Sequence, residues 1–409
     1  MPPSTASLRR PSVVAVAAAA VASFAIIGAD SRWLVALGAT FAHSLPFASA
    51  PTSGWHDVPV LAQSVFAGLY DLFGERGLVL AQMAAAAAAF VVLARGVRSD
   101  VVLLVVLIGT LAQLLVVHAE LFSLVLFPAL LLLLERAPER LWLAVPLLAL
   151  WSNLHGSALV GLALLVVYVA IADRRRWPVA IAAAVGLCVT PALWHTPQYY
   201  WGVAQNEAAR RGVGLWAPLG LRPLDVVLAL CAVALAGVGR RRFSRWEAVA
   251  AVGLALATLH SARLGVWLLF LLAYPASRAL PDRRYPVLFA LPFALLAILG
   301  LAHTPFDAGS RTLAKRAAAT HAAVLAEPIL AEEVELYGGR VWVADPIDAF
   351  RARDQSLYLD WLDGRAPRAV RNARYVLVRH ASRAGRAAAS DPRLSKIGED
   401  NGFVLYRRR

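Results

Sequence analysis

The chain has 409 residues, of which 59% are hydrophobic and 16% charged, and its mean hydropathy is +0.62. Globular domains carry about 25% charged residues, so this composition excludes an ordinary soluble enzyme, and so apolar a chain cannot remain disordered in water. The formal net charge is +14. A basic excess is found in nucleic-acid-binding proteins, but cytoplasmic loops of membrane proteins carry one as well.

Apolar segments of nearly spanning length recur between residues 13 and 303. We expect them at 13–29, 77–94, 101–117, 120–134, 141–154, 157–172, 178–193, 223–238, 247–260, 264–280 and 285–303. About 20 apolar residues are needed to cross a bilayer as a helix. The sequence therefore predicts an all-α polytopic domain over residues 1–303 with about eleven transmembrane helices.

The distribution of basic residues predicts an orientation for these segments. If Arg9 and Arg10 lie in the cytoplasm, the inner loops hold 16 basic residues and the outer segments before residue 304 hold 6. This asymmetry is the positive-inside pattern of membrane proteins. It predicts a multi-pass membrane protein with a cytoplasmic N-terminus. The basic charge is then assigned to cytoplasmic loops, and no nucleic-acid partner is expected.

Two outer segments of this arrangement are long. The first, 30–76, contains an apolar stretch, Val58 to Phe73, with helical spacing. We expect a helix lying on the outer membrane surface, and a twelfth span is the alternative. The second, 194–222, is rich in aromatic residues, which is also typical of an interfacial belt.

The composition changes after residue 303. Residues 304–409 contain 18 basic and 13 acidic residues. Short apolar runs at 340–345 (RVWVAD), 374–380 (RYVLVRH) and 402–408 (GFVLYRR) predict strands, and 348–364 predicts a helix between them. We expect a small soluble α/β domain, which an odd number of spans places outside the cell.

The histidines before residue 304 all fall on the predicted outer side. They are His43, His56, His118, His155, His195, His260 and His303. Ionisable residues near membrane depth usually line functional sites, which favours an outward-facing polar cavity. The alternative is that outer loops simply hold polar residues while the inner loops favour arginine.

Acidic residues accompany these histidines. Asp30 ends the first apolar segment, Asp57 follows His56, and Glu120 lies close to His118. A carboxylate in such a place could act as general base toward an acceptor hydroxyl or could bind a divalent cation, although the sequence assigns no metal. For Asp30 the alternative is a structural ion pair with Arg32.

Two further features are candidates for binding. In WSNLHG (151–156), Asn153 and His155 follow an apolar helix, where polar groups are costly unless they bond a neighbour or a ligand. Arg263 begins an apolar segment and could bind a phosphate through two hydrogen bonds or anchor the helix at an interface. The chain has no P-loop, HExxH or CxxC pair, so nucleotide hydrolysis and a thiolate metal site lack support.

Several short motifs together resemble a known family. WSNLHG (151–156) matches a W-x-N-x-H-G segment, and DSRW (30–33), LPFASAPTSGWHDVPVL (45–61) and HAELFSLVLF (118–127) follow the same pattern in order. The chain resembles the GT-C class of membrane glycosyltransferases, and most closely bacterial membrane proteins related to the protein mannosyltransferase-like group. It departs from many of them because Ser31, not a second acid, follows Asp30.

The resemblance implies an enzyme of a bacterial inner (plasma) membrane, in contact with membrane lipid. Such an enzyme transfers a sugar from a polyprenyl-phosphate donor to an extracytoplasmic acceptor. It implies that Asp30 is the catalytic base. The residues expected to bind substrate are Arg32, Trp33, His56, Asp57, His118, Glu120, Asn153, His155 and Arg263. A non-catalytic membrane scaffold and a transporter of lipid or solute are the alternatives.

Overall fold

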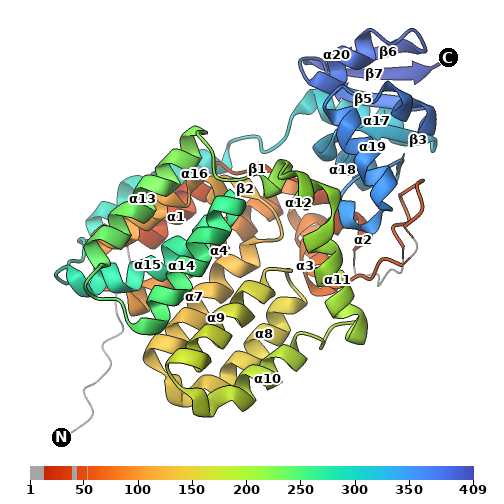
Figure 1. The fold of residues 1–409 in the computed structure, drawn as a ribbon. Helices are drawn as coiled ribbons and strands as arrows, with labels where there is room; N and C mark the ends of the chain where they lie inside the picture. The colour runs from red at the N-terminus through yellow and green to blue at the C-terminus, as the bar shows by residue number, and fades with distance from the viewer. Residues whose placement is uncertain (1–12, 39–43, 53) are drawn as a thin grey trace, which may run out of the picture.

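The computed structural model describes residues 13–38, 44–52 and 54–409, so Arg9, Arg10 and His43 lie outside the described residues. It consists of a body of packed helices and a C-terminal sheet with its own helices. Figure 1 shows the C-terminal part, in blue, at one corner of the helical body. Four helices lie on the side of the body that faces the sheet: α2 (Arg32–Leu37), α3 (Val60–Phe73), α11 (Thr196–Gln205) and α12 (Glu207–Arg211).

The helical body is formed by twelve helices from the described part of the chain, which surround one apolar core. Phe127, Trp151, Trp267 and Phe270 are buried at its centre with their ring centroids about 5–6 Å apart. The helices are α1 (Val13–Ala22), α4 (Glu75–Gly96), α5 (Asp100–Gly109), α6 (Leu111–Leu114), α7 (Leu121–Arg136), α8 (Ala144–Ser152), α9 (Ala158–Ile171), α10 (Trp177–Gly186), α13 (Pro223–Gly239), α14 (Arg245–His260), α15 (Gly265–Ala279) and α16 (Leu291–Leu301).

The lengths of these helices contradict the predicted transmembrane domain. Among the described residues only α4, with 22 residues, is long and apolar enough to cross a membrane, and half of its most apolar stretch is buried inside the protein. The other apolar helices have 10–17 residues. One such helix is too few for about eleven spans. The polytopic GT-C-like fold class, the multi-pass inner-membrane location and the extracytoplasmic placement derived from the span count are therefore wrong.

The discrepancy has a local cause, because the apolar segments do not form helices along their whole length. The segment 13–29 ends its helix at Ala22 and becomes a short strand, β1 (Ile26–Ile27). The segment 101–117 breaks at Thr110, whose hydroxyl donates to the Val106 carbonyl, and ends in β2 (Val116–Val117). Hydropathy measures only how apolar a segment is. It does not detect the turns that interrupt these helices, because the turn residues are as apolar as the helices beside them.

The C-terminal residues form a five-stranded mixed sheet in the order β4-β3-β5-β7-β6. Strand β3 is parallel to β4 and β5, and β7 is antiparallel to β5 and β6. The strands are β3 (Ala323–Ala326), β4 (Arg340–Val341), β5 (Tyr375–Arg379), β6 (Leu394–Asp400) and β7 (Phe403–Arg408), and the helices are α17 (Ala308–Ala318), α18 (Pro328–Leu336), α19 (Ala352–Leu362) and α20 (Arg383–Ala389). The strands predicted at 374–380 and 402–408 and the helix predicted at 348–364 correspond to β5, β7 and α19.

The C-terminal sheet packs against a segment from the N-terminal part of the chain. The segment that contains α2 (Arg32–Leu37) and α3 (Val60–Phe73) shares a second apolar core with it, to which Leu34, Phe47 and Phe66 contribute from one side and Val324 and Val341 from the other. The Ser49 amide also donates to the carbonyl of Val341, 2.7 Å away, and so extends the edge of the sheet at β4. The predicted helix at 58–73 is present as α3, and it packs against α2 and α4.

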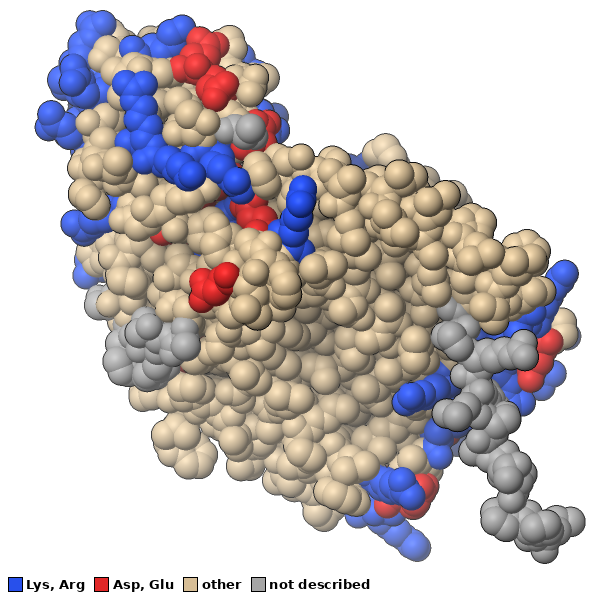
Figure 2. Space-filling model, turned by 180° about the vertical axis from the view of Figure 1, so that it is seen from behind, with Lys and Arg blue, Asp and Glu red and all other residues tan. Residues whose placement is uncertain are grey.

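The surface of the helical body is unusually apolar for a protein in water. Figure 2 shows charged side chains over the C-terminal part and at the opposite end of the molecule, with a broad uncharged expanse between them. Large apolar side chains are exposed along α10, α13, α14 and α16, and they include Ile181, Val185, Leu230, Val233, Val252, Leu256, Leu295 and Ile298. A continuous exposed apolar surface of this kind marks contact with lipid or with another protein.

Candidate functional site

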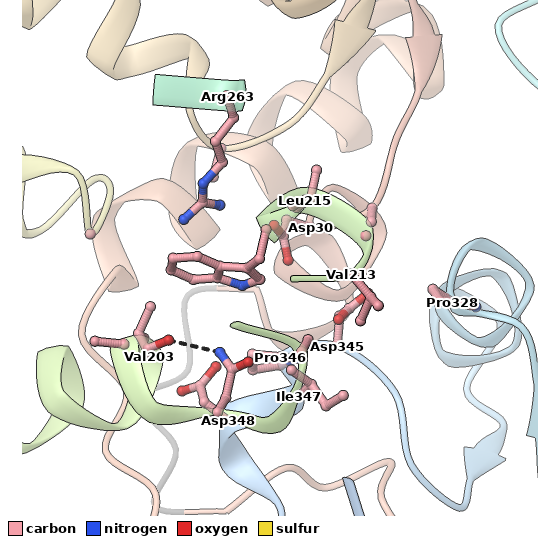
Figure 3. Close-up of a pocket in the computed structure, with 18 of the residues that line it drawn as sticks. Asp30, Val203, Val213, Leu215, Arg263, Pro328, Asp345, Pro346, Ile347 and Asp348 are labelled. Carbon is pink, nitrogen blue, oxygen red and sulfur yellow. Dashed lines mark hydrogen bonds between the residues drawn. The ribbon is translucent and has the colours of Figure 1, made fainter. Parts of the chain in front are cut away.

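A cavity lies between the helical body and the C-terminal sheet. Its volume is about 890 Å³, within the range of small-molecule binding sites. Its walls include the turn before α2, the residues after β2, the segment 155–160, the segment of α11 (Thr196–Gln205) and α12 (Glu207–Arg211) with the short helix Gly214–Trp216, the turn around Arg263, the loop after β4 and the end of α19. Figure 3 shows acidic side chains and Arg263 around this space.

A short parallel strand pair brings the first two acidic residues together. Strand β1 pairs with β2 in parallel, with Ile26 opposite Val116 and Ile27 opposite Val117. The chain therefore leaves both strands at the same edge, and Asp30 and Glu120, each three residues beyond its strand, both reach the cavity wall. The hydroxyl of Ser31 donates to the Val117 carbonyl, 2.7 Å away, and fixes this junction.

Asp30 is held by its backbone as well as by its side chain. Its φ is +71°, in the left-handed region that Asp tolerates better than most residues. The carboxylate of Glu332, from α18, accepts the amide hydrogens of Asp30 at 2.8 Å and of Arg32 at 2.9 Å. Because no side chain of α2 caps its own N-terminus, Glu332 takes over the capping role from 300 residues away.

The environment of the Asp30 carboxyl makes it a stronger base than an exposed aspartate. Burial raises its pKa above the usual value, and the hydrogen bond from the Trp33 indole, 3.2 Å long, and the positive charge of Arg263 lower it by less. A carboxylate with a raised pKa that faces a cavity is suited to accept a proton from a substrate hydroxyl.

Glu120 and His118 form a second ionisable pair next to Asp30. Burial raises the pKa of Glu120 to about 7, against the lowering effect of Arg263, and the nearby Asp30 raises it further. Burial, and to a smaller extent Arg263, lower the pKa of His118 to about 4. At neutral pH His118 is therefore uncharged, and its Nδ1 atom accepts the Glu120 amide hydrogen at 3.2 Å. His118 adjoins the cavity without forming part of its wall.

Arg263 is the cation that faces these carboxyl groups. It lies in the short helix Ala262–Leu264, and its guanidinium carbon is 3.9 Å from the centre of the Trp216 ring. Two other arginines line the cavity, but Arg211 pairs with Asp360 at 2.8 Å and Arg365 pairs with Asp363 at 2.7 Å. Among the described cavity residues, Arg263 is thus the arginine without a carboxylate at ion-pair distance.

The WSNLHG segment divides into structural and cavity-facing residues. His155 lines the cavity, and its Nδ1 atom is 2.8 Å from the Ser157 hydroxyl. Burial, then the charges of Arg263 and His118, lower the pKa of His155 to about 3. The amide group of Asn153 donates to the carbonyls of Ala149 and Val189 at 2.9 and 2.6 Å, and it is not part of the cavity wall. Asn153 therefore joins α8 to the turn after α10.

Three more of the predicted binding residues lie outside the cavity. Arg32 is buried in ion pairs with Glu75 at 2.8 Å and Glu333 at 3.5 Å, so it does not pair with Asp30. The imidazole of His56 stacks on that of His195 with centroids 4.2 Å apart. Asp57 is fully buried and accepts a hydrogen bond of 2.6 Å from Gln63. The predicted residues that do meet at the cavity are Asp30, Trp33, Glu120, His155 and Arg263.

Sequence reasoning missed the cavity wall that the C-terminal part supplies. Asp345 and Asp348 lie in the loop after β4, and Figure 3 shows both on the side of the cavity away from Arg263. Burial raises the pKa of Asp345 well above its usual value and that of Asp348 to about 7. The available signal was the acidic end of the predicted strand RVWVAD, since carboxyl ends of parallel strands commonly form binding sites.

A metal site does not emerge from this arrangement. No group of three or more His, Cys, Asp or Glu side chains in the described residues is placed to hold a metal ion. A divalent cation, considered from the sequence as a ligand of the outer carboxylates, therefore has no preformed site among these residues.

Comparisons with known proteins found no match to this chain. It matches no protein-family model, no curated protein and no solved structure. The glycosyltransferase assignment suggested by the short motifs therefore gains no support from a family or a relative.

Proposed function

We propose that the cavity binds a phosphate-linked sugar and transfers the sugar to a hydroxyl group of an acceptor. The observation that carries this proposal is that two groups face the same cavity: Asp30, a partly buried carboxylate with a raised pKa, and Arg263, which has no carboxylate partner among the described residues. A phosphodiester carries one negative charge, which one guanidinium can neutralise with two hydrogen bonds.

The reaction follows from these two groups. The acceptor hydroxyl gives its proton to the Asp30 carboxylate while its oxygen forms a bond to the anomeric carbon of the sugar. The bond between that carbon and the phosphate oxygen breaks, and its electron pair leaves on the phosphate, whose growing charge Arg263 stabilises. A single displacement of this kind inverts the configuration at the anomeric carbon.

An apolar groove beside the cavity suits the lipid part of a polyprenyl-phosphate donor. A second pocket of about 330 Å³ is lined mainly by apolar and aromatic side chains, including Leu187, Pro197 and Trp201. It shares Leu159, Tyr200 and Ala204 with the main cavity, so the two spaces adjoin. A phosphate at Arg263 would thus have an apolar path for its hydrocarbon chain.

The exposed apolar side chains of α10, α13, α14 and α16 support a lipid environment for this donor. Leu230 and Val233 on α13 are 64% and 71% exposed, although a side chain of this size gains free energy when it leaves water. Contact with membrane lipid accounts for these residues, and it would present a lipid-linked donor to the groove.

Sugar transfer by the purified full-length chain in lipid nanodiscs tests the proposal. The donors are polyprenyl-phosphate-linked mannose, glucose and galactose, and products are detected by mass spectrometry. We expect transfer from at least one donor, a fall of about 10²–10⁴-fold in rate for Asp30→Asn, and a weaker donor interaction for Arg263→Gln. Asp282→Asn, at an exposed position outside the cavity, is the matched control.

Absence of transfer from all three donors would contradict the proposed reaction. Undiminished transfer by Asp30→Asn would remove Asp30 as the base, because an amide cannot accept the proton.

A further inference from the structure

The wall of the cavity opposite Arg263 contains two carboxyl groups that are open to the cavity. Among the described residues, no hydrogen bond or ion pair engages the side chain of Asp345, which lies in the cavity wall. Asp348 follows at the short helix Ile347–Ala349 and faces the same space. Both residues are partly exposed, so their carboxyl groups are accessible to a ligand in the cavity.

The indole N–H of Trp55 is a buried hydrogen-bond donor beside these carboxyl groups, and it also indicates a ligand. The Trp55 side chain is 6% exposed and lines the cavity, and among the described residues its Nε1 atom has no hydrogen-bond partner of good geometry. It lies near Asp348. An indole N–H is a donor only, so this wall offers one donor next to two carboxyl groups.

Aromatic rings enclose the same region. Tyr199 and Tyr358 line the cavity together with Trp55, and the Tyr358 hydroxyl is already used in a bond of 2.8 Å to the Ala326 carbonyl. The free surface of these rings is therefore mainly apolar. Flat aromatic rings beside carboxyl acceptors suit a ligand with several hydroxyl groups and apolar C–H faces.

The composition of this wall disfavours a second phosphate and a simple peptide. Among the described cavity residues beside Asp345 and Asp348, the arginines Arg211 and Arg365 are already paired with carboxylates, so this wall offers no free cation to a phosphate. A serine or threonine of a peptide brings one hydroxyl, which cannot satisfy two carboxyl groups and an indole N–H at once. A carbohydrate brings many hydroxyl groups, each of which both donates and accepts.

We infer that Asp345, Asp348 and Trp55 form an acceptor subsite and that the acceptor is a carbohydrate. This inference rests on the proposed function, which places the donor phosphate at Arg263 and the reacting carbon next to Asp30. In a single displacement the acceptor oxygen arrives on the side opposite the leaving phosphate. Figure 3 shows Asp345 and Asp348 on the side of Asp30 away from Arg263, where an acceptor would lie.

Binding measurements on the full-length chain test the subsite separately from the reaction. The probes are α-1,6-mannotriose, cellotriose and chitotriose, followed by saturation-transfer NMR, and geranyl phosphate as a donor analogue. We expect at least one trisaccharide to bind, with a dissociation constant raised at least tenfold in Asp345→Asn/Asp348→Asn and in Trp55→Phe. Geranyl phosphate should bind these variants as it binds the wild type, and Arg263→Gln should weaken geranyl phosphate alone.

The outcomes separate this inference from the proposed function. Asp282→Asn is the matched control, and an unchanged melting curve of Trp55→Phe shows that the fold is intact. If no trisaccharide binds, or if the double variant binds it as well as the wild type, the subsite is wrong. Competition by a serine-containing peptide in place of the trisaccharides would overturn it as well. In these cases Arg263-dependent binding of geranyl phosphate would leave the donor site of the proposed function standing.

Discussion

Asp30 and Arg263 interact across the cavity although 233 residues separate them in the sequence. Burial raises the pKa of Asp30, and the positive charge of Arg263 counteracts part of this rise. Both residues could be identified as site candidates from the sequence, because each lies at the end of an apolar segment. It could not show that they face one cavity, since that depends on the β1–β2 pair and on the position of the short helix at Arg263.

The charge of Arg263 should be visible in the pH dependence of sugar transfer. Asp30 acts as a base only when it is deprotonated, so the rate falls as the pH drops through its pKa. Arg263 lowers the pKa of Asp30, and Arg263→Gln should therefore raise it and shift the acid limb of the kcat/KM profile to higher pH. Arg211→Gln also removes a cavity arginine, and it should leave the midpoint of the acid limb unchanged. An unshifted midpoint in Arg263→Gln would show that Arg263 does not lower the pKa of Asp30.

Glu120 should make the protein less stable as the pH rises. Its pKa is raised from 4.5 to about 7 in the folded chain, so its contribution to stability is complete below pH 4.5 and is lost as the pH rises to about 7. His118, with a pKa lowered to about 4, acts in the opposite direction over an overlapping range. A comparison of Glu120→Gln with wild type isolates the contribution of Glu120. The free energy of unfolding of the variant minus that of wild type should increase between pH 4.5 and 7, by up to about 3 kcal/mol. A difference that does not change with pH, in denaturant titrations followed by tryptophan fluorescence, would refute this.

Helix α18 of the C-terminal part holds the backbone of the turn at Asp30. Glu332 and Glu335 lie on this one helix and both are buried, but their partners differ. The Glu332 carboxylate accepts two backbone amide hydrogens, whereas neither carboxyl oxygen of Glu335 has a hydrogen-bond partner in the described part of the chain. Burial, followed by the charges of Glu332 and Asp345, raises the pKa of Glu335 well above its usual value.

This difference predicts opposite effects of the same substitution at the two positions. Glu335→Met should raise the free energy of unfolding by about 1–3 kcal/mol, because it replaces an unsatisfied buried carboxyl with an apolar side chain of similar size. Glu332→Met should lower it by about 2–4 kcal/mol and reduce sugar transfer, because it leaves two amide hydrogens at Asp30 and Arg32 unpaired. Urea titrations measure both, and destabilisation of similar size in the two variants would contradict the assignment of partners.

Sequence patterns identified many of these elements but not their lengths. Long apolar runs correctly located helices such as α4, α7, α9 and α15, and short apolar runs located β5 and β7. The predicted spans failed because hydropathy does not detect where a helix ends. Thr110 and Gly186, for example, lie inside or beside apolar runs and mark the end of α5 and α10. The strands β1 and β2 are two residues each, too short for any periodicity to reveal.

At the scale of the whole molecule, the cavity exists only because the two parts share a core. Leu34, Phe47 and Trp55 from the N-terminal third pack against the C-terminal sheet and its loops. The sequence favoured a separate appendage after residue 303, because its change in composition is abrupt. Composition shows where a segment changes character, but it carries no information about which distant surface the segment covers.

This shared core predicts that removal of residues 304–409 disrupts the segment that carries Asp30. The shortened chain should expose the apolar residues of α2 and of the stretch before α3, and should lose the two bonds from Glu332. In limited proteolysis the region 26–60 should then be cut much faster than in the full-length chain, while α7 and α9 remain protected in their own core. Equal protection of 26–60 in both chains would show that the first segment folds without the sheet.

The proposed reaction requires Asp30 to take a proton from an acceptor hydroxyl during sugar transfer. Single-turnover transfer from a polyprenyl-phosphate-linked sugar, measured side by side for the wild-type chain, Asp30→Asn and Asp282→Asn, tests it most directly. We predict a measurable rate for wild type, the same rate for Asp282→Asn, and a rate about 10²–10⁴-fold lower for Asp30→Asn with the donor still bound. A wild-type chain that binds the donor without transferring its sugar, or an Asp30→Asn chain as fast as wild type, would contradict the claim.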